Sequence, residues 1–292
     1  MSAALHRARD VERLVAGQAT SDGAGVRLTR VLTQEWQQRL DPFLMLDHFG
    51  SDEPQDYIAG FPDHPHRGFE TVTYMLQGRM RHRDSRGNEG LLQNGDVQWM
   101  TAGRGLFHSE MPEQDQGKME GFQLWLNLPS HLKLCEPRYQ DIAHAQLPQV
   151  APAPGVRVTV IAGEIGATQG PIQSPHTQPQ FWDVHFDEDG LFEATLPGTH
   201  HAFIYVYRGC VQVLGEQRST AVPSERMGVL GAGEGLRLQA QTGGRAIVLA
   251  GHPLREPIAQ HGPFVMNTEA EIRTAIEDYR SGRMGHIGAQ PV

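Results

Sequence analysis

The sequence predicts an all-β protein made of two β-rich halves and one short C-terminal helix. Three observations support this fold class. The chain holds 33 glycines and 19 prolines in 292 residues, so turns are frequent and long helices are disfavoured. Short apolar or alternating runs lie between turn dipeptides, as strands do. A proline-rich segment separates the two halves of the chain.

The first half reads as a series of hairpins. Its expected strands are Val26 to Leu32, Phe69 to Leu76, Gln98 to Thr101 and Gly121 to Leu128. Between them lie turn signals that supply positive φ angles or side-chain turns, namely Gln77-Gly78, Arg86-Gly87-Asn88 and Asn94-Gly95-Asp96.

The segment from Leu147 to Gly155 is rich in proline and free of charge, which is typical of a linker. We therefore expect two domains, 1–146 and 147–292. A second β-rich stretch follows, from Val156 to Leu249. The Tyr74 to Gly78 run is echoed at Tyr205 to Gly209, and Gly95 is echoed at Gly233, which indicates a duplicated unit.

The C-terminal region predicts the helix. Thr268-Glu269-Ala270-Glu271 is a capping box. In this motif the threonine side chain accepts a hydrogen bond from the backbone N–H of the second glutamate, whose side chain accepts one from the backbone N–H of the threonine. Ile272, Ile276 and Tyr279 then share one helical face, and Gly282 ends the helix.

Charge and composition exclude several classes of protein. With 39 % hydrophobic residues the chain can bury a core, and its formal net charge of −9 disfavours a direct nucleic-acid partner. No apolar run approaches the roughly 18 residues of a membrane span, so no membrane partner is expected. Only Cys135 and Cys210 occur, which excludes a disulfide framework and fits a cytoplasmic protein.

A His-x-His pair, His64 and His66, suggests a metal site. Residues two apart on a strand share one face, so both imidazoles can reach one ion at about 2.0–2.1 Å. Pro65 lacks the N–H that a central strand needs, which places the segment at a sheet edge. Alone, the pair is equally compatible with two exposed or core histidines.

A second pair with the same spacing, His108 and Glu110, follows 42 residues after His66. That interval accommodates two or three further strands. If antiparallel strands bring the two pairs together, three imidazoles and one carboxylate surround a metal. A six-coordinate ion would keep two positions for substrate and for oxygen or water. The simpler interpretation of the second pair is a salt bridge at a strand end.

Five segments together give the sequence a family resemblance. They are Asp41 to Phe49, Gly60 to Thr71, Gln98 to Gly105, His108 to Pro112 and Gly262 to Thr268, and they are similar to the pirin family of the cupin superfamily. The resemblance implies two cupin barrels (double-stranded β-helix, or jelly-roll), with iron in the first barrel and no metal in the second. The family's metal ligands fall on His64, His66, His108 and Glu110. Some members are quercetin 2,3-dioxygenases and others are metal-dependent partners of transcription factors.

The resemblance also implies different roles for Glu110 and Glu70, with Glu110 as the metal ligand. Ordinary cupins place the glutamate ligand a few residues after His-x-His, where Glu70 stands, so Glu70 is here free to be a buried, paired residue. Offsets from Gly209 and Gly233 place the second-half counterparts of the ligands at Thr195, Pro197, Ala246 and Val248, which cannot hold a metal. His200 and His201 are adjacent, so we expect one to be buried and the other exposed.

The expected function is that of a dioxygenase. Imidazole and carboxylate suit iron, nickel, cobalt, copper, manganese or zinc, and the resemblance implies one Fe(II) per chain. The partners are then a small aromatic substrate such as a flavonol and O2, with Glu110 as the catalytic base. Phe61, Met100 and Phe107 are candidates for the walls of the substrate pocket.

Two alternatives remain open at this point. A metal-responsive or redox-responsive protein could bind a transcription factor or a metabolic enzyme through a surface that includes Arg67 and Ser109. A zinc-dependent sugar isomerase is disfavoured, because no further acid and base pair has an interpretable spacing.

Overall fold

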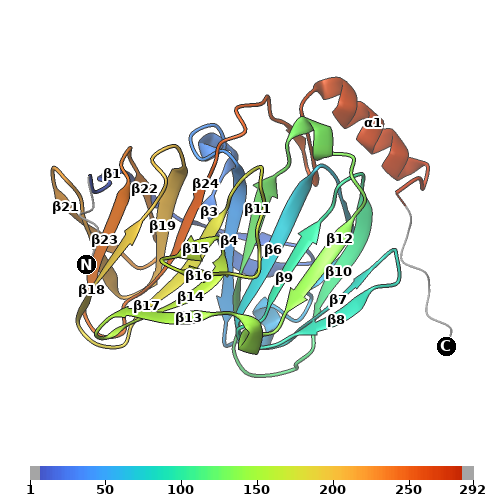
Figure 1. The fold of residues 1–292 in the computed structure, drawn as a ribbon. Coiled ribbons are helices and arrows are strands. Elements are labelled where there is room, and N and C mark those ends of the chain that lie inside the picture. Colours follow the sequence, from blue (N-terminus) through green and yellow to red (C-terminus); the bar gives the residue numbers. More distant parts are fainter. Residues whose placement is uncertain (1–6, 285–292) are drawn as a thin grey trace. The chain divides into compact units, whose positions relative to one another are not determined.

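The computed structural model describes residues 7–284. Its contacts divide the chain into two compact units. The first unit comprises residues 19–34, 43–144 and the chain from 255 onward, and the second comprises the chain up to residue 18, residues 35–42 and 145–254. Strands dominate both units (Figure 1).

The first unit contains a seven-stranded and a four-stranded antiparallel sheet. The larger has the order β12-β9-β6-β11-β4-β3-β2 and the smaller β5-β10-β7-β8. The strands are β2 (Gln18–Asp22), β3 (Val26–Leu32), β4 (Phe43–Ser51), β5 (Phe61–His66), β6 (Phe69–Gln77), β7 (Met80–Asp84), β8 (Glu89–Leu92), β9 (Val97–Thr101), β10 (Leu106–Pro112), β11 (Met119–Asn127) and β12 (Arg138–Ile142). A hairpin and a helix complete it, β25 (Ala259–His261), β26 (Phe264–Met266) and α1 (Glu269–Arg280).

The second unit has the same plan. Its sheets have the orders β1-β22-β19-β24-β17-β14-β13 and β18-β23-β20-β21. The strands are β1 (Val11–Ala16), β13 (Gln149–Ala153), β14 (Val156–Ala162), β17 (Gln180–Phe186), β18 (Gly190–Thr195), β19 (His201–Arg208), β20 (Cys210–Leu214), β21 (Ser219–Pro223), β22 (Arg226–Leu230), β23 (Gly235–Ala240) and β24 (Arg245–Gly251). A small separate hairpin joins β15 (Glu164–Ile165) to β16 (Thr168–Gln169).

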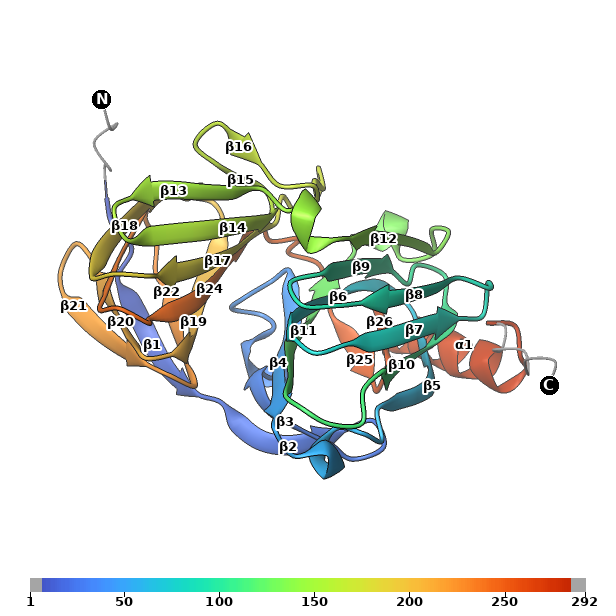
Figure 2. The ribbon, with the colours of Figure 1, turned by 90° about the horizontal axis from the view of Figure 1, so that it is seen from below.

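The two units correspond strand by strand. β6 takes the place of β19, β10 that of β23 and β11 that of β24, and the sheet orders agree except at the edge position of β12, which β1 occupies in the second unit. The register irregularities agree as well, because both the β3–β4 and the β14–β17 pair shift at the same step. The predicted duplication therefore extends to the details of strand pairing, and Figure 2 shows the paired strands of each unit from below.

The units are not the two simple halves expected from the sequence. β1 pairs with β22 and so belongs to the second unit. Conversely, β26 and α1 belong to the first unit, where Phe264 forms a parallel bridge to Arg67. β1, from the first half of the sequence, therefore completes a sheet of the second unit, and β26 and α1, from the second half of the sequence, complete the first unit.

The proline-rich segment is a strand and not simply a linker. Within it, β13 pairs with β14 from Gln149 opposite Thr159 to Ala153 opposite Val156, with an irregular register. β13 is the edge strand of its sheet, and an edge tolerates prolines because one row of backbone groups needs no partner. The linker prediction was wrong for this reason.

Strand and helix predictions elsewhere are confirmed. β3, β6 and β9 cover three of the predicted runs and β11 covers the fourth except for Leu128, and Gly78, Gly87 and Gly95 have positive φ angles at the predicted turns. α1 is capped by Thr268, with both hydrogen bonds of the capping box present. Between residues 7 and 284, no helix is long and apolar enough to cross a membrane.

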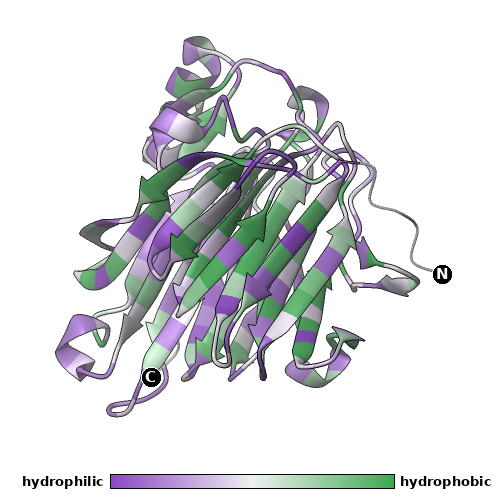
Figure 3. Ribbon diagram, turned by 90° about the vertical axis from the view of Figure 1, so that its left-hand side faces the viewer, coloured by the Kyte–Doolittle hydropathy of each residue, from purple (hydrophilic) through white to green (hydrophobic). Residues whose placement is uncertain are grey.

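The interiors of the units differ in character. One large cluster of buried apolar side chains lies in the second unit, whereas the clusters found among the described residues of the first unit are smaller. Strands carry both hydrophobic and hydrophilic positions along their length, as Figure 3 shows. In the first unit, some of the inward positions are polar, and these positions build the candidate site.

Candidate metal centre

β5 and β10 bring the two predicted pairs together. The strands are antiparallel neighbours, with His108 opposite His64 and Leu106 opposite His66. β5 is the edge strand of its sheet, as Pro65 predicted. Four strands, β6 to β9, lie between the pairs in sequence, where two or three were expected.

The three imidazoles form one compact group. A ring nitrogen from each of His64, His66 and His108 lies within 4.8 Å of the others, and the ring centroids are 4.3 to 4.9 Å apart. Two nitrogens bound to one ion at about 2.1 Å can be at most about 4.2 Å apart. A small inward shift of the rings would therefore place all three around a single ion.

Burial favours the neutral form of two of the imidazoles, those of His66 and His108. Burial lowers the pKa of His66 well below its usual value, and the charge of His64 adds to this, although the Pro263 carbonyl opposes it. Burial likewise lowers the pKa of His108, with contributions from neighbouring histidines. Neutral imidazole is the form that binds a metal.

The hydrogen bonds also leave nitrogens available. His64 Nδ1 is 2.7 Å from the Pro62 carbonyl oxygen, which can only accept, so Nδ1 carries a proton and Nε2 is the nitrogen that could bind a metal. Among the described residues, His66 Nδ1 and both ring nitrogens of His108 are buried without a hydrogen-bond partner. Such nitrogens are costly to bury, and a bound metal ion would satisfy them.

Glu110 lies beside this group without being part of its closest set. It is buried and borders the same cavity as His64 and His66. Thr73 Oγ1 lies 2.8 Å from Glu110 Oε1, and Gln123 Nε2 lies 3.4 Å from Oε2. Its oxygens lie outside the 4.8 Å group. The β5–β10 register shifts between His108 and Glu110 through one extra residue on β5, whereas the β10–β7 register is regular there, so His108 and Glu110 share one face of β10.

A cavity of about 420 Å³ opens onto the histidines. This volume is in the range of small-molecule sites. Apolar and polar side chains share its wall, which is lined by Asp22, Gly23, Leu28, Arg30, Gln34, Met45, Asp47, Phe49, Phe61, His64, His66, Glu110, Gln123, Trp125, Gln260, Gly262 and Pro263. Phe61 therefore lines the cavity.

Met100 and Phe107 do not line it, so these two predictions were wrong. Met100 is fully buried in a core cluster with Ala102 and Leu106. Phe107 neighbours His108, and successive residues of a strand face opposite sides. Its ring therefore packs against α1, stacked on Tyr279 with the centroids 5.5 Å apart.

Arg67 and Ser109 are also misplaced as docking residues, because both are buried. Arg67 donates to Asp278 on α1 and to the Arg104 carbonyl. Glu70, which the sequence left free of the metal, is buried and accepts a hydrogen bond from Thr101 at 2.6 Å. Burial raises the pKa of Glu70.

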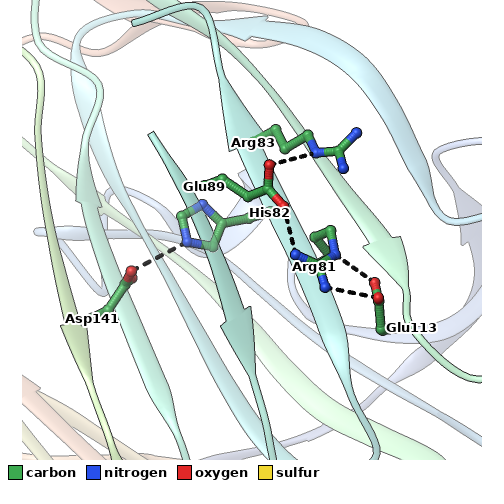
Figure 4. Close-up of polar contacts among 6 residues, drawn as sticks. All are labelled: Arg81, His82, Arg83, Glu89, Glu113 and Asp141. Atoms are coloured by element: carbon green, nitrogen blue, oxygen red, sulfur yellow. Dashed lines mark hydrogen bonds and ion pairs between the residues drawn. The ribbon is translucent and has the colours of Figure 1, made fainter. Parts of the chain in front are cut away.

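Sequence reasoning missed a row of polar residues across the larger sheet. Directly opposed positions on six successive strands are Arg30, Asp47, Gln123, Thr73, Gln98 and Asp141. Asp141, at one end, accepts from Gln98 at 2.9 Å and contacts the buried His82 at 3.3 Å (Figure 4). His82 lies opposite Glu110 on the neighbouring strand. Polar residues at inward positions of otherwise apolar strands were the available signal.

The sequence also misplaced the second-unit counterparts of the ligands. Strand correspondence places them at Ala194, Leu196, Leu236 and Leu238, and not at Thr195, Pro197, Ala246 and Val248. These four residues are apolar and buried, so they cannot act as metal ligands either. His200 is buried, as expected of one member of its pair, while His201 is half-buried.

Comparison with known families shows two matches. Residues 25–126 match the family described as Pirin, and residues 181–285 match the one described as Pirin C-terminal cupin domain. Together these matches span most of the chain, so the two-cupin fold and the family resemblance are confirmed.

Individual relatives cover nearly the whole chain. A protein of Pseudomonas aeruginosa named "Putative quercetin 2,3-dioxygenase" is 51 % identical over 282 residues, which is 95 % of this chain and 99 % of the relative. A "Pirin-like protein" of Caulobacter vibrioides is 49 % identical, covering 94 % and 99 %. The crystal structure of a quercetin 2,3-dioxygenase from Acinetobacter baumannii matches with a TM-score of 0.89 and 34 % identity, covering 96 % and 100 %.

Proposed function

This chain belongs to the pirin family, and from that premise we propose that it is a metal-dependent dioxygenase that cleaves a flavonol such as quercetin with O2. The names of two similar proteins, one of them a solved structure, support this activity. The observation that carries the proposal is structural. Three imidazoles converge on one point, and two of them, with the carboxylate of Glu110, line a cavity of about 420 Å³ that has a partly apolar wall.

One divalent transition metal would be held by His64, His66 and His108, with Glu110 as the fourth ligand. Iron(II) is the proposed ion, and nickel, cobalt, copper, manganese or zinc would suit the same donors. When bound, such an ion would supply Lewis acidity for the substrate hydroxyl and a centre for oxygen chemistry. The unpartnered nitrogens of His66 and His108 are the structural support for this assignment.

Glu110, which lines the cavity, is the proposed general base. It would accept the proton of the flavonol 3-hydroxyl, since a carboxylate within hydrogen-bond reach of the reacting group is the usual acceptor. Thr73 and Gln123 contact its two oxygens and so fix its orientation. The proposed reaction is balanced: two carbon–carbon bonds of the central ring break, both oxygen atoms of O2 enter the phenolic ester product, and carbon monoxide leaves.

Oxygen uptake tests the proposal directly. Protein loaded with iron(II) should bleach the flavonol absorbance while consuming one O2 per flavonol, and His108→Ala should abolish both. His48→Ala is the matched control, because His48 is a half-buried histidine of the same unit that does not line the cavity. Absence of turnover with every first-row metal would reject the activity.

The proposal implies O2 and a small aromatic molecule as partners, and a cytoplasmic location, which two free cysteines favour. A metal-responsive binding protein is the second candidate. The burial of Arg67 and Ser109 counts against the surface first suggested for it. Capture of a protein partner by the iron(II) form but not the iron(III) form would favour that role, and equal capture or none would reject it.

A further inference from the structure

A charged cluster occupies one wall of the cavity. Arg30 Nε lies 2.9 Å from Asp47 Oδ1, and Arg30 Nη2 lies 2.7 Å from Asp47 Oδ2 and 2.8 Å from Asp22 Oδ2. The three residues come from neighbouring strands, β3, β4 and β2. All three line the cavity that contains His64, His66 and Glu110. We call this cluster the Arg30 clamp.

The clamp is rigid and well suited to binding hydroxyl groups. The contact between Arg30 and Asp47 is bidentate, and a paired fork of this kind has a defined geometry. The Asp47 side chain is only 3 % exposed, whereas Arg30 is 29 % exposed and Asp22 is 52 % exposed. Arg30 can donate more hydrogen bonds than the three it makes here, and each carboxylate oxygen can accept a second one. The clamp therefore keeps both donors and acceptors for a ligand.

The clamp lies at a defined separation from the proposed catalytic base. Asp47 is directly opposite Gln123, which contacts Glu110, and Arg30 is one strand further. Neighbouring strands are about 4.8 Å apart, so the backbone of Arg30 is about 10 Å from that of Gln123. Trp125 and Phe61 provide flat apolar surface for an aromatic molecule on the same cavity.

The charge of the lining also selects the ligand. Asp22, Asp47 and Glu110 outnumber Arg30, the one guanidinium in the cavity lining. A carboxylate or sulfate on the outer part of a ligand would meet repulsion there. A neutral hydroxyl would instead find acceptors, and a site built for a hydroxyl rejects ligands that lack one.

We propose that the Arg30 clamp determines substrate specificity by binding the ring hydroxyls of a neutral polyhydroxylated aromatic molecule, at the end remote from the hydroxyl that faces Glu110. The identity of that molecule as a flavonol depends on the proposed function. The clamp itself is inferred from the contacts, the cavity and the register.

Binding without turnover tests the clamp. Calorimetry under nitrogen would compare quercetin, which has four hydroxyls besides the 3-hydroxyl, with 3-hydroxyflavone, which has none of them, on the metal-loaded protein. The wild type should bind quercetin at least about tenfold more tightly, as expected for hydrogen bonds to charged groups. Asp47→Asn should remove most of this preference, because it should weaken the binding of quercetin far more than that of 3-hydroxyflavone.

Two milder variants keep the test informative if Asp47→Asn does not fold. Arg30→Lys retains the charge but loses the bidentate fork, and Asp22→Asn changes the more exposed partner, so both should reduce the preference. Equal loss of affinity for both ligands, or an unchanged preference in all three variants, would overturn the proposal. If the variants lose the preference for quercetin but the wild type shows no turnover, the dioxygenase proposal is rejected and the clamp is kept. If the wild type turns over quercetin but the variants keep the preference, the clamp is rejected and the dioxygenase proposal is kept.

Discussion

The two units use one strand plan for opposite purposes. In the first unit the inward residues of the site are polar, and in the second their counterparts are apolar members of the core. The proposed ligands His64, His66, His108 and Glu110 correspond to Ala194, Leu196, Leu236 and Leu238. The exchange of a few inward side chains on a shared backbone thus separates a candidate metal centre from a packed interior.

The polar row across the larger sheet follows the same rule. Arg30, Asp47, Gln123 and Thr73 correspond to Val160, Trp182, Val248 and Ile204. Trp182 is among the largest fully buried side chains of the protein, and it occupies the strand position that Asp47 has in the first unit. A large indole fills space that a short carboxylate leaves open, which accounts for the cavity at this position in the first unit.

The largest effect is expected when a ligand is replaced by its counterpart. His108→Leu introduces the residue found at Leu236 and removes one of three converging nitrogens. Metal affinity should fall at least about a hundredfold, beyond the 10–100-fold cost of losing a residue that only supports a ligand. Metal content after dialysis measures this, and retention of one ion per chain would contradict the metal-centre assignment.

The reverse exchange should damage the second unit. Leu238→Glu places a carboxylate in a fully apolar interior, where no described side chain replaces the Thr73 and Gln123 contacts of Glu110. We expect a loss of about 3–5 kcal/mol in the free energy of unfolding, measured by urea denaturation. Leu238→Met is the matched control, and a loss under about 1 kcal/mol for the glutamate variant would show that this interior is not dry.

The sequence could predict the ligand pairs because a strand repeats every two residues. That period predicted which side chains of each pair share a face, and the family resemblance assigned the two pairs to one site. The sequence could not predict the second-unit counterparts of these residues, because the structural counterpart of Gly95 is Glu225 and not Gly233. The Gly95 N–H donates to the Met75 carbonyl, and the Glu225 N–H donates to the Val206 carbonyl at the equivalent position. Glu225 has the same positive φ, so the glycine signal is absent there.

The polar row shows a second limit of sequence reasoning. Each of its members is a single polar residue on a different strand, and only the pairing of strands far apart in sequence aligns them. Likewise, Phe107 could be assigned to the cavity or to the opposite face only once the side occupied by His108 was known. Register is set by tertiary packing, and the local pattern leaves it open.

Acid should weaken the second unit through His200. Burial lowers the pKa of His200 to about 4, and the charges of His252, Arg9 and His201 add to this. His200 of the unfolded chain binds a proton near pH 6.5, whereas the buried side chain of the folded protein does not. The contribution of neutral His200 to the free energy of unfolding is therefore complete above pH 6.5 and is lost as the pH falls toward 4. Between pH 7 and pH 5 the expected loss is about 2 kcal/mol.

His200→Gln isolates that contribution, because glutamine does not titrate. Unfolding of the metal-free protein by urea at pH 7 and pH 5 should show a smaller pH dependence in the variant than in the wild type. Parallel changes in both proteins would mean that His200 is protonated in the folded state as easily as in the unfolded chain.

The smallest effect concerns the support of Glu110. Gln123→Val introduces the residue found at Val248 and removes one contact to the carboxylate. The metal content should remain, while the flavonol turnover rate should fall about tenfold, since losing a supporting hydrogen bond costs 10–100-fold. An unchanged rate with full metal occupancy would show that Gln123 does not position Glu110.

Anomalous diffraction from crystals equilibrated with iron(II) under nitrogen tests the central claim most directly. The account predicts one strong peak per chain within about 2.3 Å of a ring nitrogen from each of His64, His66 and His108, and no such peak inside the second unit. A map with no peak among these three imidazoles would contradict the account if peaks elsewhere on the same chain showed that iron had entered the crystal.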